Sequence, residues 1–205
     1  MEISDSYYTI EENNVVTIKV NRSNFIAQTF PVKSDQEISE VLENVKKKYY
    51  NARHHPFAYR IGLEKINFKT NDDGEPAGTA GKPILEVIDK FNLTNVIVVV
   101  TRYFGGVKLG VGGLRRAFFD TAEECIKSAK IIERFLYENL KLEFEYKFMN
   151  GVMRLLEEEN VKNIMNESDE KVKLNCEVRL SKTKKLKEDL MNITNGTVKI
   201  SFNIN

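Results

Sequence analysis

Short runs of alternating apolar and polar residues dominate the start of the chain, and this pattern is typical of β-strands. Residues 15–20 and 25–30 are two such runs, and the polar stretch between them predicts a hairpin. An earlier strand is expected near residues 7–10. Ser34 opens a capping box, and apolar side chains follow every three to four positions up to Tyr49, which predicts the first helix.

The chain continues with two expected strands and two expected helices. Residues 57–69 predict one strand, and residues 95–104 predict a central strand because they are apolar on both faces. Pro83 suits the first turn of a helix that extends to Phe91, because proline needs no backbone hydrogen bond there. Residues 114–129 carry one apolar stripe and predict a long helix. Strands and helices are mixed, so an α+β domain is expected.

A second pattern occupies the rest of the chain, where apolar and charged side chains alternate strictly. Strands are expected over 140–148, 161–165, 171–180 and 198–204, with helices around 152–156 and 186–193. The resulting order, βαββαβ, is that of a ferredoxin-like domain. The sequence therefore predicts two domains, covering residues 1–136 and 137–205. Tyr146, Phe148 and Phe202 fall on the apolar face of the strands, so they are expected in the core rather than on a base-stacking surface.

Composition limits the classes of function. Of 205 residues, 41% are hydrophobic and 30% are charged, as expected for a globular protein. The net charge is only +1, so nucleic-acid binding requires a local basic patch. The N-terminus lacks the pattern of a signal peptide, and the apolar run at 96–100 is too short to cross a bilayer, so a cytoplasmic protein with no membrane partner is expected. Cys125 and Cys176 occupy apolar positions, which predicts buried reduced thiols.

Two glycine-rich loops, at residues 70–85 and 101–116, are the candidates for chemistry. Neither has the glycine spacing of a Walker loop or of a dinucleotide-binding loop, so no cofactor is expected. In the second loop, free amides near Gly112 and Gly113 precede the long helix and favour an anion. The expected anion- or nucleic-acid-binding residues are Lys82, Arg102, Lys108, Gly112, Gly113, Arg115 and Arg116. The alternative is that the glycines only permit tight turns and the cations form a solvated face.

The first loop is acidic, with Asp72, Asp73 and Glu75 close together. Paired carboxylates can bind a divalent cation or act as acid and base, but Asp-Gly and Glu-Pro are also common turn chemistry. His54 and His55 stand next to each other before a strand, and a structural or binding role is expected for them. No serine or cysteine has the surroundings of a nucleophile. We therefore expect no catalytic residues and no bound metal.

The two loops are expected to line one groove. The first loop starts a helix that leads directly into the central strand, and the second loop follows that strand. A strand rises ~3.3 Å per residue and a helix ~1.5 Å, so the strand extends past the helix and ends beside the first loop. We expect Asp73 or Glu75 to pair with Arg102 or Lys108 at this place.

The motifs "DDGEPAGTAGKPIL" and "NVIVVVTRYFGGVKLGVGGLRRA" closely resemble the signature of the IMPACT (YigZ) family, and the upstream "RSNFIAQTFPV" and "NARHHPFAYRIG" fit its pattern. The resemblance covers roughly residues 17–128 and extends by pattern to the second domain of the bacterial members. The residues that it places around the motif groove are His54, Tyr59, Asp73, Glu75, Thr79, Gly81, Tyr103, Gly105 and Gly106.

The resemblance implies a first domain like domain IV of elongation factor G, with an unusual left-handed βαβ connection, and a second domain like its domain V. It also implies a role near translation, because the eukaryotic relatives are translational regulators and the bacterial members look like RNA- or ribosome-associated proteins of unsettled role. The leading hypothesis is a cytoplasmic, non-enzymatic regulator of translation or of a stress response that binds RNA or the ribosome through the basic groove. The alternatives are a protein-interaction module that uses the C-terminal domain, and an enzyme acting on a phosphate-containing or peptide substrate.

Overall fold

The computed structural model of the chain describes residues 5–62 and 67–202, and these fall into two units. The first unit is Tyr7–Arg134, and the second starts at Phe135 and includes Asp5 and Ser6. The sequence pattern assigned residues 5 and 6 to the first unit and put the boundary two residues later. Both units mix helices and strands, so the protein is of the α+β class.

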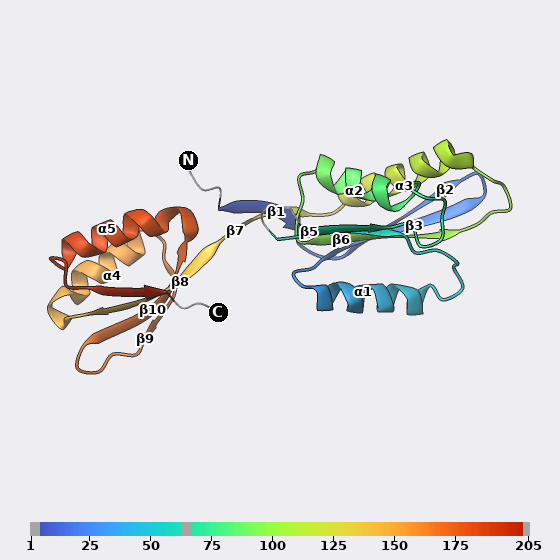
Figure 1. The fold of residues 1–205 in the computed structure, drawn as a ribbon. Coiled ribbons are helices and arrows are strands. Elements are labelled where there is room, and N and C mark those ends of the chain that lie inside the picture. Colours follow the sequence, from blue (N-terminus) through green and yellow to red (C-terminus); the bar gives the residue numbers. More distant parts are fainter. Residues whose placement is uncertain (1–4, 63–66, 203–205) are drawn as a thin grey trace. The chain divides into compact units, whose positions relative to one another are not determined.

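The first unit is built on a five-stranded antiparallel sheet (Figure 1). Its strands, in spatial order, are β2 (Asn14–Val20), β3 (Ser23–Pro31), β6 (Val96–Tyr103), β4 (Phe57–Ile61) and β5 (Asn67–Asn71). The predicted hairpin is the pair β2 and β3, and the predicted central strand is β6, with two strands on each side.

The single strand expected over residues 57–69 is instead two strands, β4 and β5, which pair antiparallel. Gly62 has a φ of +82°, a conformation that favours glycine, and it ends β4 directly after Ile61. Residues 63–66 lie outside the described part of the chain. The sequence prediction was wrong here because an apolar pattern does not reveal a chain reversal.

Helices cover both faces of this sheet, which explains the doubly apolar β6. Helix α1 (Asp35–Lys48) packs on one face, where Ile97 and Val99 point. Helices α2 (Gly81–Lys90) and α3 (Gly110–Lys127) pack on the other, where Val96, Val98 and Val100 point (Figure 1). All five side chains are fully buried. The first unit therefore has three layers, with its two apolar cores separated by the sheet.

The strand order requires one left-handed crossover. Helix α1 joins the parallel strands β3 and β4 across β6, and α2 joins the parallel strands β5 and β6 across β4. When each connection is viewed along the direction of the strand that it leaves, both move the chain to the same side within the sheet. Their helices nevertheless lie on opposite faces of the sheet. Two such crossovers must have opposite hands, whereas nearly all βαβ connections are right-handed. The left-handed connection expected from the resemblance is therefore present.

The second unit has the predicted order βαββαβ. Its antiparallel sheet has the order β11 (Lys199–Phe202), β8 (Tyr137–Phe144), β10 (Val172–Arg179), β9 (Lys162–Asn166). Helices α4 (Met149–Glu158) and α5 (Thr183–Ile193) bury Leu156 and Leu186 against the apolar face of this sheet. Strand β8 ends at Phe144 and a 3-10 turn follows, so Tyr146 is 54% exposed rather than in the core. Phe202 is also 44% exposed, against the prediction.

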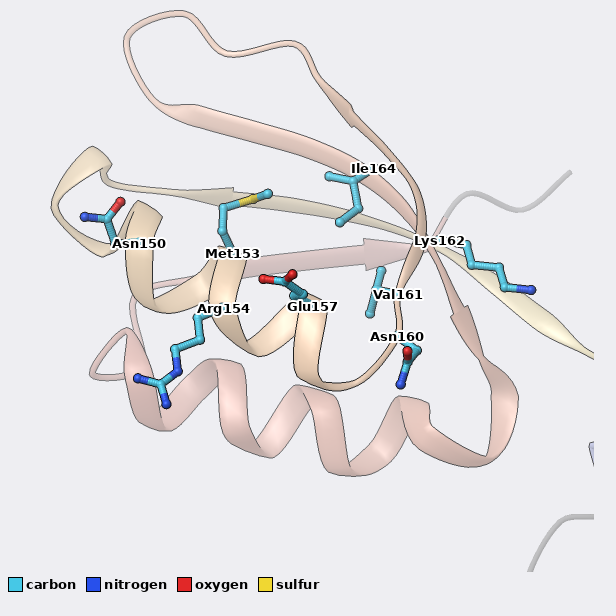
Figure 2. A pocket seen from close by; sticks show the side chains of 8 residues that line it. All are labelled: Asn150, Met153, Arg154, Glu157, Asn160, Val161, Lys162 and Ile164. Atoms are coloured by element: carbon cyan, nitrogen blue, oxygen red, sulfur yellow. The ribbon is translucent and has the colours of Figure 1, made fainter.

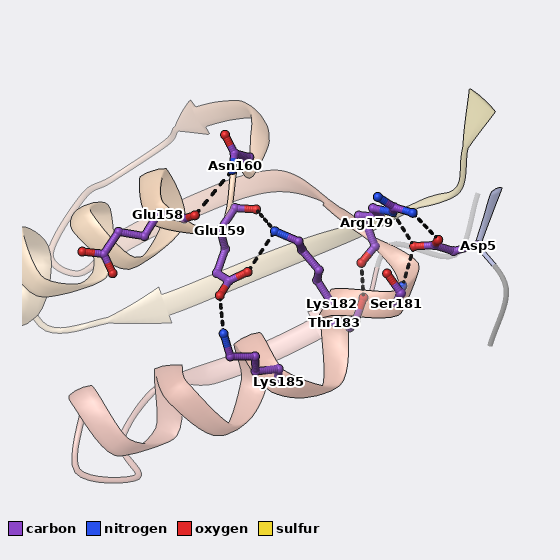
Figure 3. A network of polar contacts seen from close by, with 9 residues as sticks. All are labelled: Asp5, Glu158, Glu159, Asn160, Arg179, Ser181, Lys182, Thr183 and Lys185. Carbon is purple, nitrogen blue, oxygen red and sulfur yellow. Dashed lines mark hydrogen bonds and ion pairs between the residues drawn. The ribbon is translucent and has the colours of Figure 1, made fainter. Parts of the chain in front are cut away.

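Asp5 explains why the start of the described chain belongs to the second unit. Its carboxylate accepts hydrogen bonds from Nε and Nη2 of Arg179, both at 2.8 Å, and from the amide of Ser181 at 2.9 Å (Figure 3). Its carbonyl accepts a further bond from the amide of Leu136. Hydrogen bonds from Arg179 hold the pKa of Asp5 well below its usual range, although burial opposes this effect.

Strands β1 (Ser6–Ile10) and β7 (Ile131–Phe135) form a separate two-stranded sheet. Within the described ranges, no helix is both long and apolar enough to span a bilayer.

Candidate binding groove

A groove of ≈ 850 Å³ in the first unit brings the two glycine-rich loops together. Three segments form it: the loop before β4, the turn at Glu75, and the stretch from the end of β6 to the first turns of α3. The lining residues are Asn51, Ala52, Arg53, His54, Glu75, Pro76, Arg102, Tyr103, Phe104, Lys108, Leu109, Gly110, Val111 and Leu114. The prediction that both loops border one groove is therefore confirmed.

An ion pair between Glu75 and Arg102 joins the two loops, as the sequence predicted. Nη1 of Arg102 lies 2.8 Å and 2.7 Å from the two carboxylate oxygens of Glu75. Only 3% of the Glu75 side chain and 9% of the Arg102 side chain are exposed. The guanidinium also lies 5.5 Å from the ring of Phe25 and 5.4 Å from the ring of Phe104. Arg102 is consequently a buried, neutralised cation rather than part of an exposed basic patch.

The other two carboxylates of the first loop bind backbone amides. Asp72 accepts hydrogen bonds from the amides of Gly78, Ala80 and Gly81, at 2.8–2.9 Å, and so caps the start of α2. Burial raises the pKa of Asp72, but the three amide bonds together outweigh it and leave this pKa below its ordinary value. Asp73 accepts a bond from the amide of His55 at 2.7 Å. The acidic loop thus shows turn chemistry, which was one of the two alternatives.

No group of three or more acidic, histidine or cysteine side chains suited to a metal occurs in the described ranges. Both histidines instead tie the loop before β4 to its neighbours. Nδ1 of His54 lies 2.6 Å from the carbonyl of Asp73, and Nδ1 of His55 lies 3.0 Å from the hydroxyl of Thr101. Burial lowers the pKa of His55, which favours its neutral form. These contacts fix the loop that carries Arg53 into the groove.

Two glycines are required by close backbone contacts rather than by a ligand. A Cβ on Gly105 would lie 2.1 Å from the backbone of Arg22, and a Cβ on Gly81 would lie 2.7 Å from the amide of Asn71. A side chain at Gly105 would force the chain after β6 away from the turn between β2 and β3, and one at Gly81 would force the start of α2 away from the end of β5. Gly106, by contrast, has a φ of +83° with open space around it, and it does not line the groove.

The basic patch expected from the sequence is not one surface. Of its members, Lys108 and Arg102 line the groove. Arg115 pairs with Glu86 at 2.7 Å, and together with Gly112 and Arg116 it lines a separate cavity of ≈ 320 Å³. Lys82 is exposed on α2, outside both cavities.

Helix α3 begins at Gly110, so Gly112 and Gly113 lie inside its first turns rather than before it. Glycine weakens a helix without excluding it, and burial of Leu114 and Phe118 stabilises this one. The free amides of the helix start consequently lie closer to the groove than the sequence indicated.

The remaining motif residues divide between groove and core. Tyr103 lines the groove, and its hydroxyl donates to Oδ1 of Asn51 at 2.7 Å. Thr79 is buried and donates to the carbonyl of Pro76 at 2.6 Å. Tyr59 is buried on the α1 face of the sheet, so it does not belong to the groove. Alternation along β4 could have shown this, because Ala58 faces the opposite core.

Sequence reasoning missed two exposed groove residues. Arg53 is exposed in the loop before β4, and Phe104 is 58% exposed directly after β6. The sequence did contain a signal for Phe104. This aromatic residue stands between a buried strand and the Gly105-Gly106 turn, where no core position is expected, so it could have been predicted to be exposed. Arg53 and Lys108 form no ion pair with any residue in the described ranges, so they are the uncompensated charges of the groove.

A second cavity, of ≈ 810 Å³, lies in the second unit between α4 and the edge strand β9. Its apolar side is made by Met153, Val161 and Ile164. Figure 2 shows the charged ends of Arg154 and Lys162 pointing away from each other rather than converging. Arg154 is engaged by Glu158 at 2.9 Å. This cavity lacks a convergent set of polar groups, which small-molecule sites usually have.

The fold and the groove define a class of protein: a two-unit α+β protein that has a left-handed crossover and a groove built from two glycine-rich loops. The Impact N-terminal domain family matches residues 21–126. The IMPACT family member YvyE of Bacillus subtilis is 36% identical, over 93% of this chain and 88% of that protein. The chain belongs to the IMPACT family.

Two further comparisons extend over nearly the whole chain. The IMPACT family member YigZ of Escherichia coli is 27% identical, over 90% of this chain and 92% of that protein. A crystal structure described as that of "an hypothetical protein" is similar with a TM-score of 0.72 and 25% identity, and the similarity covers 99% of each chain. The second unit is therefore shared with these relatives along with the first.

Proposed function

We propose that this protein is a non-enzymatic, cytoplasmic regulator of translation or of a stress response, and that it binds RNA or the ribosome through the groove. The observation that carries the proposal is that two exposed cations, Arg53 and Lys108, line the same groove as the exposed ring of Phe104. Cations bind the phosphates of RNA, and aromatic rings bind its bases. With Asp72, Asp73 and Glu75 engaged by amides and by Arg102, the groove offers an enzyme no free carboxylate from this loop.

The resemblance supports a site of action near the ribosome. We propose that residues 1–136 act as a domain like domain IV of elongation factor G, and residues 137–205 as a ferredoxin-like domain like its domain V. The left-handed crossover of the first unit and the βαββαβ order of the second support this likeness. The eukaryotic members of the family are translational regulators, which also supports a role in translation.

The test is the salt dependence of RNA binding by the full chain. Each phosphate neutralised by a lysine contributes about 0.7–0.9 to the slope of log K against log salt. Lys108→Ala should weaken binding and reduce that slope by this amount. Lys82→Ala is the matched control, because Lys82 is an exposed lysine outside the groove, and it should leave both values unchanged. If ribosomes and RNA fail to associate with the wild-type protein even at low salt, the proposal is wrong.

A second candidate function, protein interaction through the second unit, is favoured by the open face of its sheet. This face carries both signs of charge, for example Glu143 between Lys171 at 3.6 Å and Lys199 at 3.1 Å. Mixed charges of this kind contribute more to the choice of partner than to the strength of binding. Charge reversal at Lys173 and Glu177 in the full chain should release a protein partner without changing RNA binding. A partner that is retained by this variant would contradict the docking role.

A further inference from the structure

Phe104 is an exposed aromatic side chain with a fixed support. It follows β6 at the groove and is 58% exposed. Its ring lies 5.4 Å from the guanidinium of Arg102, which the carboxylate of Glu75 holds in place. The same guanidinium lies 5.5 Å from Phe25, a fully buried core residue. A ring that is held by its contact with a rigid buried group keeps the rest of its surface free for a ligand at little cost in side-chain entropy.

The charged residues of the groove are one neutralised pair and two exposed cations, and all of them line the same groove as Phe104. Glu75 and Arg102 neutralise each other, and Arg115 is paired with Glu86 outside the groove. Arg53 and Lys108 line the same groove as Phe104, both are exposed, and neither is paired with a described residue. The groove therefore offers one exposed aromatic surface and two uncompensated positive charges.

A single kind of RNA uses both features. In a duplex the bases are stacked on each other, so a protein reaches their edges, the sugars and the phosphates but not their flat faces, and the ring of Phe104 has no base face to stack on. An unpaired segment exposes the flat faces of its bases as well as its phosphates, and aromatic stacking adds to the electrostatic attraction.

We propose that the groove binds single-stranded RNA, with one base stacked on Phe104 and the adjacent phosphates bound by Arg53 and Lys108. This inference rests on the proposed function, because it specifies which form of RNA the groove takes. Phe104 supplies the preference for unpaired nucleotides, and the two cations supply the salt-dependent affinity.

The main experiment compares one labelled oligoadenylate, alone and annealed to oligouridylate, in binding titrations with the full chain. Phe104→Ala should weaken binding of the single strand by about 5- to 150-fold and leave the duplex nearly unchanged. The matched control is Phe68→Ala. Phe68 is also an exposed phenylalanine, 52% exposed, with its ring 4.9 Å from the guanidinium of Arg60, and it lies on β5 outside the groove.

Salt titrations separate the two components of binding. Phe104→Ala should lower the affinity for the single strand at every salt concentration without changing the slope of log K against log salt, because stacking releases no counterions. Lys108→Ala should instead reduce the slope by about 0.7, the value for one phosphate of a single strand. A slope change with Phe104→Ala would show that the ring acts only by positioning the cations, and would overturn the stacking role.

Tryptophan fluorescence provides a second readout, which reports stacking directly rather than through the affinity. The sequence contains no tryptophan, so Phe104→Trp introduces a single indole emitter at the groove. Its fluorescence should be quenched when the oligoadenylate stacks on it, and the affinity of this variant should equal or exceed that of the wild type. Phe68→Trp should show no quenching. Thermal unfolding of each variant verifies that the exposed substitutions leave the fold intact.

The outcomes distinguish this inference from the function on which it rests. If the wild-type protein binds neither the single strand nor the duplex, the inference is wrong, and the proposed function is wrong as well if ribosomes also fail to associate at low salt. If it binds both forms equally, or if Phe104→Ala behaves like Phe68→Ala, RNA binding stands and only the stacked single strand is excluded.

Discussion

Glu75 and Arg102 show how one pair of residues links the two glycine-rich loops to the core. The pair spans 27 positions of sequence and is almost completely removed from water. A buried ion pair is weak support for stability when compared with an apolar replacement, but losing one partner leaves an uncompensated buried charge. The pair therefore makes the groove sensitive to either residue, whether or not a ligand contacts them.

Glu75→Ala should lower the free energy of unfolding by about 3–5 kcal/mol, because it leaves the charge of Arg102 buried and unpaired. Glu86→Ala is the control: it removes a partner of Arg115 from an exposed pair and should cost at most about 1 kcal/mol. Denaturant unfolding of both variants measures the difference. Small and equal losses would show that the Glu75 carboxylate does not hold the buried charge.

At the scale of elements, helix α2 depends on a cap from outside its own first turn. Ala80, its N-cap residue, has no side chain that can accept a hydrogen bond. Asp72 substitutes for it from the first glycine-rich loop and binds the amides of Ala80 and Gly81. The carboxylate of Asp72 thus holds the conformation of the acidic loop and also caps the helix that leads into β6. The loop and the helix are expected to lose order together.

Asp72→Ala should destabilise the protein by about 1–2 kcal/mol at neutral pH, the usual cost of losing a helix cap. Since the pKa of Asp72 is lower in the folded state, its contribution is present above the ordinary value of 3.8 and is lost as the pH falls through the folded pKa. The difference between wild type and variant, measured by thermal unfolding, should therefore shrink in acid. Asp72→Asn, which keeps an acceptor oxygen, should recover part of the loss.

At the scale of the whole molecule, Asp5 attaches the start of the described chain to the second unit, 174 positions away in sequence. Arg179 also lies over the ring of Phe135, at 3.8 Å from its centroid. A second set of ion pairs lies nearby: the carboxylate of Glu159 pairs with Lys182 and Lys185, and so connects the end of α4 to the start of α5 (Figure 3). Helix α5 begins with lysines at the positive end of its dipole, so the carboxylate of Glu159 offsets an unfavourable charge.

Asp5→Asn should reduce the stability of the second unit by about 1.5–3 kcal/mol near neutral pH, the range for hydrogen bonds to charged groups. The folded-state pKa of Asp5 is depressed, so wild type and variant should converge as the pH falls below the ordinary value of 3.8. Hydrogen exchange of the β10 amides, measured between neutral and acidic pH, follows this difference. An effect of Asp5→Asn that does not vary with pH would contradict an ionic attachment.

The sequence determined the class of the protein and most of its local structure, apart from the reversal between β4 and β5 and the end of β8. Periodicity alone predicts the helices, the hairpin of β2 and β3, and the central position of β6, because each depends on which faces a neighbour must cover. Cys125 and Cys176 are free and buried as predicted, and burial raises the pKa of each thiol to about 11. The shared groove was also predictable, since it follows from the different rise of a helix and a strand.

Tertiary structure alone decided which of the expected residues face the groove. Arg102 is neutralised by Glu75, Tyr59 lies on the opposite side of the sheet, and Arg115 is paired elsewhere. Conversely, Arg53 and Phe104 reach the groove without belonging to the residues singled out in the sequence. The physical reason is that exposure and pairing depend on contacts between distant segments, whereas a sequence pattern reports only the period of one segment at a time.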